Sequence, residues 1–326
     1  MRMRAPVAKI AYLCLILILV LLMIFSGLRI LESAVFSNQN PTETVSSRVI
    51  LRDGVRYYPK QDITVLLVMG IDRFGKMESS GSYNNDGAAD MVSIVVFDEG
   101  SKTCNILCLN RDTIVDMPVL GVGGKEAGTI RQQLALSHTY GTGLEDSCLN
   151  TCKTVSEFLY GLQIDHYISM NMDAIAVLND AVGGVTVNVT DDFSGIDSSI
   201  PMGSVALKGQ QAIHFVRTRK DMGDQTNVSR MERQKQYMDG FLTAFRDKLR
   251  ENSSFVMSAY QDVAEYMLTD TAANVLSGLL DRYKDYTVAD VISPQGQTVL
   301  DGEYLEFHVD EEALDALILR LFYAPR

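Results

Sequence analysis

Three uncharged runs rich in aliphatic residues predict a group of neighbouring strands. They cover Ile63–Met69, Met91–Phe97 and Thr103–Leu109, and only the short polar turn Asp98–Lys102 separates the second run from the third. Continuous apolar runs of this length are typical of strands that are buried on both faces. A short turn joins antiparallel neighbours, so we expect the three strands to form an antiparallel meander.

Apolar residues at helical spacing alternate with shorter strand-like pieces along the rest of the chain. We expect loops over 74–89 and 116–129, and short strands over 167–170, 185–189 and 215–219. The expected helices cover 130–140, 144–160, 172–182, 208–214, 230–248, 255–267, 272–283 and 311–322. Interleaved strands and helices indicate an α/β protein, most naturally an α–β–α sandwich.

The N-terminal region is different. Residues 10–25 read IAYLCLILILVLLMIF without a charge, and the apolar run continues to Leu28. This length nearly spans a hydrocarbon core of about 30 Å, which predicts one transmembrane helix over residues 9–28. A cleaved signal peptide is the alternative, although it needs a shorter apolar region and a small-residue cleavage site.

Basic residues on one side of this run predict its orientation. Arg2, Arg4 and Lys9 precede it, which places the tail 1–8 in the cytoplasm and the remainder outside the cell membrane. We expect an extracytoplasmic spacer over 29–61, a catalytic domain over 62–250, and a C-terminal extension over 251–326 that packs on that domain.

Charge and cysteine content narrow the function classes. The 326 residues contain 29 Lys and Arg against 41 Asp and Glu, a net charge of −12, which argues against a nucleic-acid partner. Cys14 lies in the apolar run, and the others form two pairs, Cys104/Cys108 and Cys148/Cys152. Four residues on a strand span about 13 Å, so Cys104 and Cys108 cannot bridge each other. We favour small core residues; disulfides remain the alternative.

The meander predicts a cluster of charged side chains. Asp72 follows the first strand, Asp90 precedes the second, and Arg111 follows the third, so all three lie at one edge of the sheet. Two carboxylates and a guanidinium would face one another there, at loop ends of the kind that carry function. An ordinary salt bridge at a strand edge is the alternative.

A second cluster lies in residues 217–235, RTRKDMGDQTNVSRMERQK, which contain six basic residues against three acidic ones. On the expected strand, Arg217 and Arg219 share a face. On the expected helix, Arg230, Arg233 and Gln234 share another. Guanidinium groups bind phosphate oxygens in a bidentate manner, and this number of arginines suits a diphosphate. For Arg233, a salt bridge with an acid is an equal alternative.

These motifs, in this order, resemble the LytR–CpsA–Psr family of membrane-anchored cell-wall enzymes. The resemblance covers about residues 62–245. It is carried by the segments VLLVMGIDR, GAADMVSIVVF, ILCLNRDT, IDHYISMNMDAI, DAVGGVTVNV, FVRTRK and SRMERQKQ. It implies an α–β–α sandwich with a central mixed sheet, preceded by one transmembrane helix. It also implies transfer of a teichoic acid or capsule-type glycopolymer from a polyprenyl-diphosphate carrier to a peptidoglycan acceptor.

Residue by residue, the resemblance implies that Asp72 and Asp90 bind Mg²⁺ or Mn²⁺ and act in catalysis with Arg111. It implies that the diphosphate is bound by Arg217, Arg219, Arg230, Arg233 and Gln234. Two positions depart from the family pattern: Ala88 stands where an arginine is common, and Asn110 where proline is usual. Two other functions stay open, a membrane-tethered envelope sensor that binds the lipid without turnover, and a lipid-diphosphate hydrolase.

Overall fold

The computed structural model describes residues 49–121, 123–218, 227–251, 255–272, 275, 278–279, 282–283, 286–302 and 304–325. The expected transmembrane helix over 9–28 and Cys14 lie outside these residues. Within the described part of the chain, no helix is long and apolar enough to cross a membrane. The domain boundaries expected from the sequence stay predictions.

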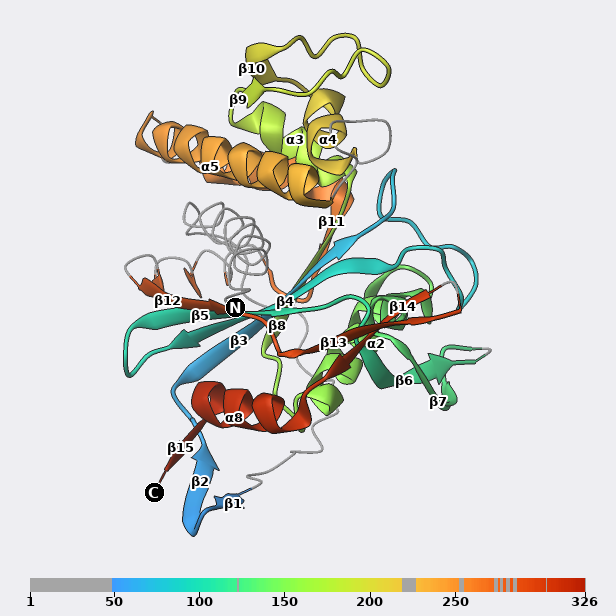
Figure 1. The fold of residues 1–326 in the computed structure, drawn as a ribbon, viewed down its shortest axis with the longest axis vertical. Coiled ribbons are helices and arrows are strands. Elements are labelled where there is room, and N and C mark those ends of the chain that lie inside the picture. Colours follow the sequence, from blue (N-terminus) through green and yellow to red (C-terminus); the bar gives the residue numbers. More distant parts are fainter. Residues whose placement is uncertain are drawn as a thin grey trace.

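A six-stranded mixed sheet forms the centre of the molecule (Figure 1). Its order is β11 (Met267–Thr269), β8 (His166–Asn171), β3 (Ile63–Ile71), β4 (Ala89–Asp98), β5 (Thr103–Leu109) and β12 (Thr287–Ile292). Strands β3, β4 and β5 pair antiparallel, as the sequence predicted. Strands β8 and β12 add parallel neighbours on either side, so the sheet is mixed.

Helices cover both faces of this sheet (Figure 1). On one face lie α3 (Asp173–Ala181), α4 (Gln210–Arg217), α5 (Asn227–Glu251) and α6 (Phe255–Val263). On the other lie α2 (Glu145–Phe158) and α8 (Glu311–Phe322). Alternate residues of β3 feed the two cores: Leu66 packs with the α3–α6 layer, and Leu67 packs with α2 and α8. This burial of both faces explains the continuous apolar strands.

Small sheets are attached to this frame. Strands β1 (Ile50–Arg52), β2 (Val55–Pro59) and β15 (Tyr323–Pro325) pair near the ends of the described chain. Strands β9 (Val185–Val189) and β10 (Gly203–Leu207) form a hairpin beyond α3. A third hairpin joins β13 (Gly296–Asp301) to β14 (Tyr304–Val309).

The expected loop over 116–129 and the expected helix over 130–140 were wrong. The segment instead forms a hairpin of β6 (Ile114–Leu120) and β7 (Glu126–Gln133), followed by the 3₁₀ helix η1 (Leu134–Thr139). Most side chains of β7 are exposed and none is buried, so its pattern is mostly polar and the hydrophobic signal for a strand was missing.

The expected strand over 215–219 was also wrong. Helix α4 continues to Arg217, and only its C-terminal capping residue, Thr218, is extended. Ala212, Ile213, Phe215 and Val216 are buried, which is the spacing of one helical face. Phe215 stacks on Phe193, with ring centroids 5.8 Å apart. This packing outweighs the weak strand preference of a Phe-Val pair.

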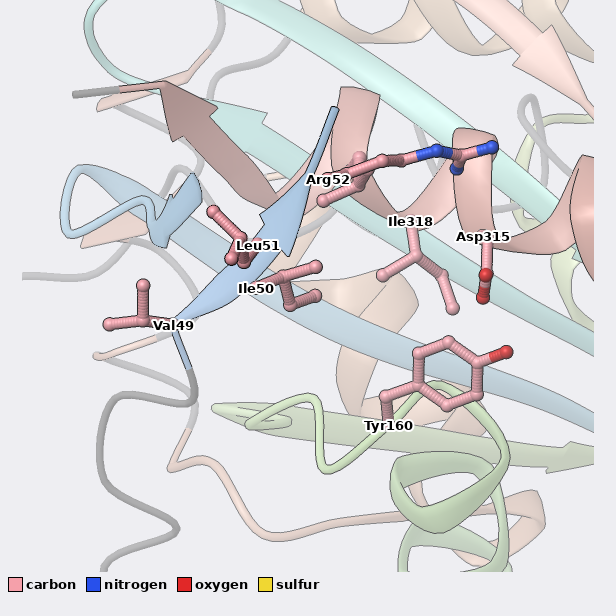
Figure 2. Close-up of a pocket in the computed structure, with 8 residues that line it drawn as sticks. Val49, Ile50, Leu51, Arg52, Tyr160, Asp315 and Ile318 are labelled. Atoms are coloured by element: carbon pink, nitrogen blue, oxygen red, sulfur yellow. The ribbon is translucent and has the colours of Figure 1, made fainter. Parts of the chain in front are cut away.

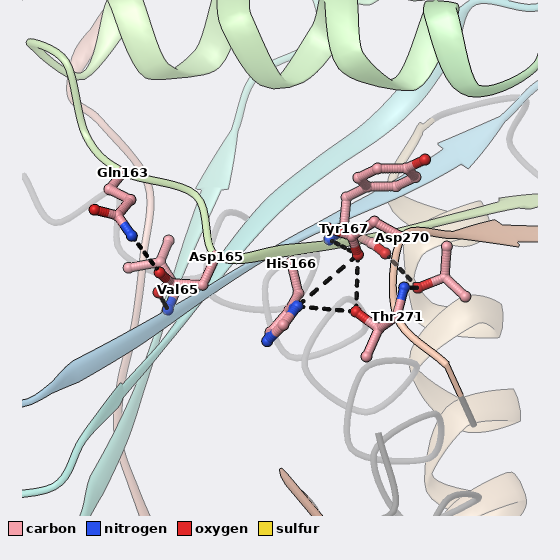
Figure 3. A network of polar contacts seen from close by, with 8 residues as sticks. Val65, Gln163, Asp165, His166, Tyr167, Asp270 and Thr271 are labelled. Atoms are coloured by element: carbon pink, nitrogen blue, oxygen red, sulfur yellow. Dashed lines mark hydrogen bonds and ion pairs between the residues drawn. The ribbon is translucent and has the colours of Figure 1, made fainter. Parts of the chain in front are cut away.

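A polar network fixes the strands at the start of β8 (Figure 3). The amide of Tyr167 donates to Asp270 over 3.0 Å, and the hydroxyl of Thr271 lies 2.9 Å from Nδ1 of His166. On the neighbouring strand, the amide of Val65 donates to Asp165 over 2.8 Å. In these bonds, side chains pair with groups near the strand ends, where the backbone hydrogen bonds of the sheet stop. They tie β8 to its neighbours β3 and β11.

No disulfide joins the four cysteines that the structure describes, and Cys104, Cys108 and Cys148 are buried. Cys104 and Cys108 point into the core beneath α3–α6, whereas Cys148 of α2 points into the opposite core. Burial raises the pKa of the Cys104 and Cys148 thiols to about 12. The interpretation of these residues as small core side chains is confirmed.

Candidate active site

The strand ends bring the first predicted cluster together. Strand β3 runs into Asp72, β4 contains Asp90 near its start, and β5 ends two residues before Arg111. Arg111 forms an ion pair with Asp90, and its Nε lies 3.5 Å from Oδ1 of Asp112. The antiparallel meander therefore places the three residues at one edge of the sheet, as expected.

Arg217 approaches the same edge from the helical layer. Its Nη2 donates to Oδ1 of Asp72 over 3.1 Å, and its guanidinium lies 5.1 Å from the ring centroid of Phe74. The side chain of Arg217 is 51% exposed. Its position comes from the C-terminal end of α4, not from the strand face that the sequence suggested. Two carboxylates and two arginines, from four segments of the chain, thus meet at one place.

Arg233 has a different position from the one its motif suggested. Its side chain is buried, and it forms an ion pair with Asp191 and hydrogen bonds to the carbonyls of Phe215 and Thr218. Gln234 donates to the carbonyl of Val216 over 3.0 Å. The last carbonyls of a helix lack partners within the helix. Arg233 and Gln234 supply them for α4 and so hold the segment that carries Arg217.

The other two arginines of the second cluster are only partly placed. Arg230 belongs to the backbone of α5, and its side chain lies outside the described part. Arg219 lies outside the described residues altogether. Their binding of a diphosphate stays a prediction.

A cleft of about 2020 Å³ opens at this cluster. Asp72, Asp90, Arg111, Arg217 and Gln234 all contribute to its lining. Between the sheet and the α3–α5 layer the lining is mainly apolar, formed by Met91, Met170, Ile175, Ile213, Val216 and Tyr237. A charged mouth thus leads to an apolar interior.

The pKa of Asp90 is raised above its ordinary value. Burial is the main cause, since it removes water from the charged carboxylate; Arg111 acts against this, and the charge of Asp72 adds to it. A carboxylate whose charge is disfavoured by burial and by a second carboxylate is a suitable place for a cation.

The donor set fits a hard divalent cation. In the described part of the chain, no three His, Cys, Asp or Glu side chains cluster so as to hold a metal by themselves. Mg²⁺ does not need such a cluster, because it keeps several waters and binds through one or two carboxylates and substrate phosphates. Asp72 and Asp90 supply two carboxylates that are close enough to influence each other.

The loop before Asp90 is anchored by residues that the sequence did not single out. The side-chain amide of Asn85 donates to the carbonyls of His138 and Gly141, over 2.9 and 3.0 Å, and to Oγ of Ser147 over 3.1 Å. Oδ1 of Asn85 accepts from the amide of Gly87, whose carbonyl accepts from Nδ1 of His138 over 2.7 Å. The site therefore has a rigid support on the α2 side of the sheet.

Burial lowers the pKa of His138 to about 4, so its ring is neutral near pH 7. A single Asn in a loop and a single His in a short helix give little signal in a sequence, because the same residues are common on surfaces.

A second cavity, of about 550 Å³, lies away from this cluster (Figure 2). It is bounded by β1, the end of α2 and helix α8, and its polar side chains include Arg52 and Asp315. Val49 and Leu51 lie at its rim, 42% and 68% exposed. It lacks facing carboxylates and paired arginines among its lining residues, so we assign no chemistry to it.

The fold and the cluster together define an α/β sandwich with a cleft at the edge of a mixed sheet, lined at its mouth by two carboxylates and two arginines. The model of the LytR_cpsA_psr family matches residues 31–321, and the chain belongs to this family.

Relatives in the same family carry enzyme names. The chain is 29% identical over 261 residues to the polyisoprenyl-teichoic acid–peptidoglycan teichoic acid transferase TagU of Enterococcus faecalis, covering 78% of this chain and 76% of that protein. It is 27% identical over 183 residues to TagU of Bacillus subtilis. That match covers 56% of this chain and 52% of the relative, so the chain spans about half of that protein's length.

Solved structures show the same fold. Protein gbs0355 from Streptococcus agalactiae superposes with a TM-score of 0.59 at 19% identity, over 80% of this chain and 86% of that one. B. subtilis TagV gives 0.57 at 23% identity, over 80% and 96%. A structure named TagT bound to LI-WTA gives 0.54 at 21% identity, over 80% and 90%.

Proposed function

We propose that this chain transfers a teichoic acid or capsule-type glycopolymer from a polyprenyl-diphosphate carrier to peptidoglycan. One observation carries the proposal: two Asp–Arg pairs from four segments meet at the mouth of an apolar cleft. Family membership and the names of the TagU relatives support the same reaction.

The cleft suits an amphiphilic donor. Arg111 and Arg217 are 41% and 51% exposed, so a diphosphate can reach their guanidinium groups and compete with the carboxylates they now contact. Arg219 and Arg230 are the further candidates that the family pattern supplies. The apolar lining formed by residues such as Met91, Ile175 and Val216 would take the first part of the polyprenyl chain.

Asp72 and Asp90 would hold the divalent cation, Mg²⁺ or Mn²⁺. Such an ion neutralises phosphate charge and orients the transferred group. Asp90 gains most from it, since burial and Asp72 both disfavour its charged form.

The reaction would be a phosphoryl transfer that depends mainly on positioning. A sugar hydroxyl of peptidoglycan attacks the sugar-linked phosphorus and forms a new P–O bond. The P–O bond to the distal phosphate breaks, and polyprenyl phosphate leaves with the electron pair. The proton of the hydroxyl passes to a base at the cleft mouth. Arg111 and Arg217 stabilise the charge that builds up on the phosphoryl oxygens.

The membrane location belongs to the same proposal. A transmembrane helix over 9–28 would tether the domain outside the cell membrane, next to its lipid-linked donor. Protease added to intact, wall-stripped cells should then digest the chain after residue 30. Protection of this part from outside would overturn the orientation.

The decisive experiment is product analysis with the full chain in detergent or nanodiscs. A lipid-diphosphate-linked glycopolymer and uncrosslinked peptidoglycan should give a covalent adduct; EDTA should abolish it, and Mg²⁺ should restore it. Asp90→Ala should lose turnover at a nearly unchanged melting temperature, while the matched variant Asp290→Ala, on an exposed surface pair, keeps both.

Each failure has its own meaning. Free glycopolymer without adduct would indicate a hydrolase, binding without turnover would indicate a sensor, and full activity of Asp90→Ala would remove the metal role.

A further inference from the structure

One wall of the cleft has no part in the donor binding proposed for Arg111, Arg217 and the apolar lining. It is formed by β14 and by the end of β7, and it includes Tyr304, Leu305, Glu306, Arg131, Gln132 and Gln133. Arg131 is paired with Asp116. Tyr304 is 70% exposed and Leu305 is 50% exposed. An exposed aromatic ring thus lies in the lining of the cleft, where a ligand can reach it.

This wall is fixed relative to the reacting centre. The amide of Phe307 donates to the carbonyl of Asp112 over 2.8 Å. Nε2 of Gln133 donates to the carbonyl of Leu305 over 2.7 Å and lies 3.3 Å from Oδ1 of Asp112. Asp112 directly follows Arg111, so the base of the hairpin is tied to the segment that carries the candidate catalytic arginine.

The chemistry of the wall differs from that of the charged mouth. It presents an aromatic face, amide side chains and the carboxylate of Glu306. A sugar has apolar C–H faces and a rim of hydroxyls, so it needs an aromatic surface and polar partners at the edge. A polyprenyl chain would not need the amides. Glu306 lies in the same wall as its single arginine, Arg131, so this wall favours a diphosphate less than the mouth with Arg111 and Arg217 does.

We propose that the wall formed by β14 and the end of β7 is the subsite for the acceptor saccharide, with Tyr304 as its stacking platform. This inference rests on the proposed transfer function. The donor enters between the sheet and α3–α5, and the acceptor glycan lies along β14. Its hydroxyl then faces the phosphorus that Arg111 and Arg217 hold. Tyr304 is thus a positioning residue for the acceptor and takes no part in binding the donor.

A fluorescence experiment tests binding without turnover. The chain contains no tryptophan, so Tyr304→Trp introduces a single reporter that can also stack on a sugar. In the full chain, a peptidoglycan tetrasaccharide should change its emission in a saturable manner. Leu300→Trp is the matched control: Leu300 is 66% exposed on the same hairpin and does not line the cleft. An unchanged Tyr304→Trp emission, or an equal response of both variants, would overturn the proposal.

A kinetic experiment separates this inference from the proposed function. Tyr304→Ala should raise the KM for the acceptor about three- to tenfold while the KM for the donor stays unchanged, and Tyr304→Phe should restore the wild-type value. Wild-type transfer with an unchanged acceptor KM in Tyr304→Ala refutes the subsite and leaves the function standing. Absence of transfer in the wild type refutes the function, and the fluorescence result then decides the saccharide site alone.

Discussion

The two faces of the central sheet differ in where their polar side chains lie. Beneath α2, the polar residues Asn85, Ser137, His138, Ser147 and Asn150 are buried and hydrogen-bonded to one another or to the backbone. Beneath α3–α5, the interior is mainly apolar. Asn179 and Arg233 are buried there, and the other charged groups of the site lie partly exposed at the mouth of the cleft. The first arrangement gives rigidity, and the second gives access.

The difference shows how one sheet can serve both purposes. On the α2 side of the sheet, Asn85 and His138 hold the loop that leads to Asp90. On the other side, Arg233 holds the end of α4 through its bond to the carbonyl of Phe215. It is the one buried arginine among the described residues. The groups that would meet substrate are therefore exposed, while the groups that position them are buried. Four predictions test this division.

The largest effect is expected for Arg233→Ala. This change leaves Asp191 and the carbonyls of Phe215 and Thr218 without their partner in a buried place. Loss of one partner of such a pair costs about 3–5 kcal/mol of the free energy of unfolding. Chemical denaturation measures it, with the exposed Arg217→Ala as a control that should lose no more than about 1 kcal/mol. Equal losses would contradict the division between the two arginines.

The next effect concerns acid stability on the α2 side. The pKa of His138 is lowered to about 4 by burial, so at lower pH the unfolded chain binds a proton before the folded one does. The free energy of unfolding should therefore fall as pH decreases from about 6.5 to 4, by roughly 3 kcal/mol in total.

Comparison with His138→Gln isolates this effect. The variant should be less stable at pH 7, and the difference should shrink as the pH is lowered. A difference that stays constant with pH would show that His138 does not titrate in this manner.

Arg217→Lys should affect turnover more than folding. Lysine keeps the charge but lacks the planar guanidinium, so bidentate binding of phosphate is lost. We expect turnover to fall roughly ten- to hundredfold, or about 1.5–3 kcal/mol, with little change in melting temperature. Arg219→Lys should behave alike. A lower melting temperature with activity kept would instead mean that Arg217 serves mainly as the partner of Asp72.

The smallest effect is expected for Arg320→Ala on the α2–α8 side. Arg320 lies 3.3 Å from Asp290, and the two side chains are 56% and 49% exposed. Pairs of this kind contribute about 0–1 kcal/mol. Denaturation of this variant beside Arg233→Ala therefore compares an exposed and a buried arginine directly, and a loss above about 2 kcal/mol would contradict the surface interpretation.

The sequence predicted the elements whose pattern reflects burial. Strands Thr103–Leu109 and Val185–Val189 and the helix Glu311–Phe322 have the expected bounds, because their apolar positions face a core. The gathering of Asp72, Asp90 and Arg111 followed from the antiparallel meander alone. The exposed strand β7 is mostly polar and gave no comparable signal.

The remaining site residues depend on tertiary contacts that leave no local mark. Arg217 reaches Asp72 because α4 continues past the expected strand boundary, and that continuation depends on Phe215 packing against Phe193. The sequence left Arg233 open between a phosphate ligand and a salt bridge. The structure shows the salt bridge, with Asp191, together with hydrogen bonds that cap α4. Asn85 became important only through carbonyls that lie more than fifty positions away in the chain.

The alkylation rates of the buried thiols report how often the structure opens locally. A thiol reacts with an alkylating reagent as thiolate, and Cys104 and Cys148 hold little thiolate while they are packed. Each reacts only when its own layer separates from the sheet. The two cysteines lie on opposite faces of the sheet. Mass spectrometry of alkylated peptides would therefore measure, in one sample, the opening rates of the cleft side beneath α3–α6 and of the side beneath α2 and α8. Added donor should lower the alkylation rate of Cys104 and leave that of Cys148 unchanged.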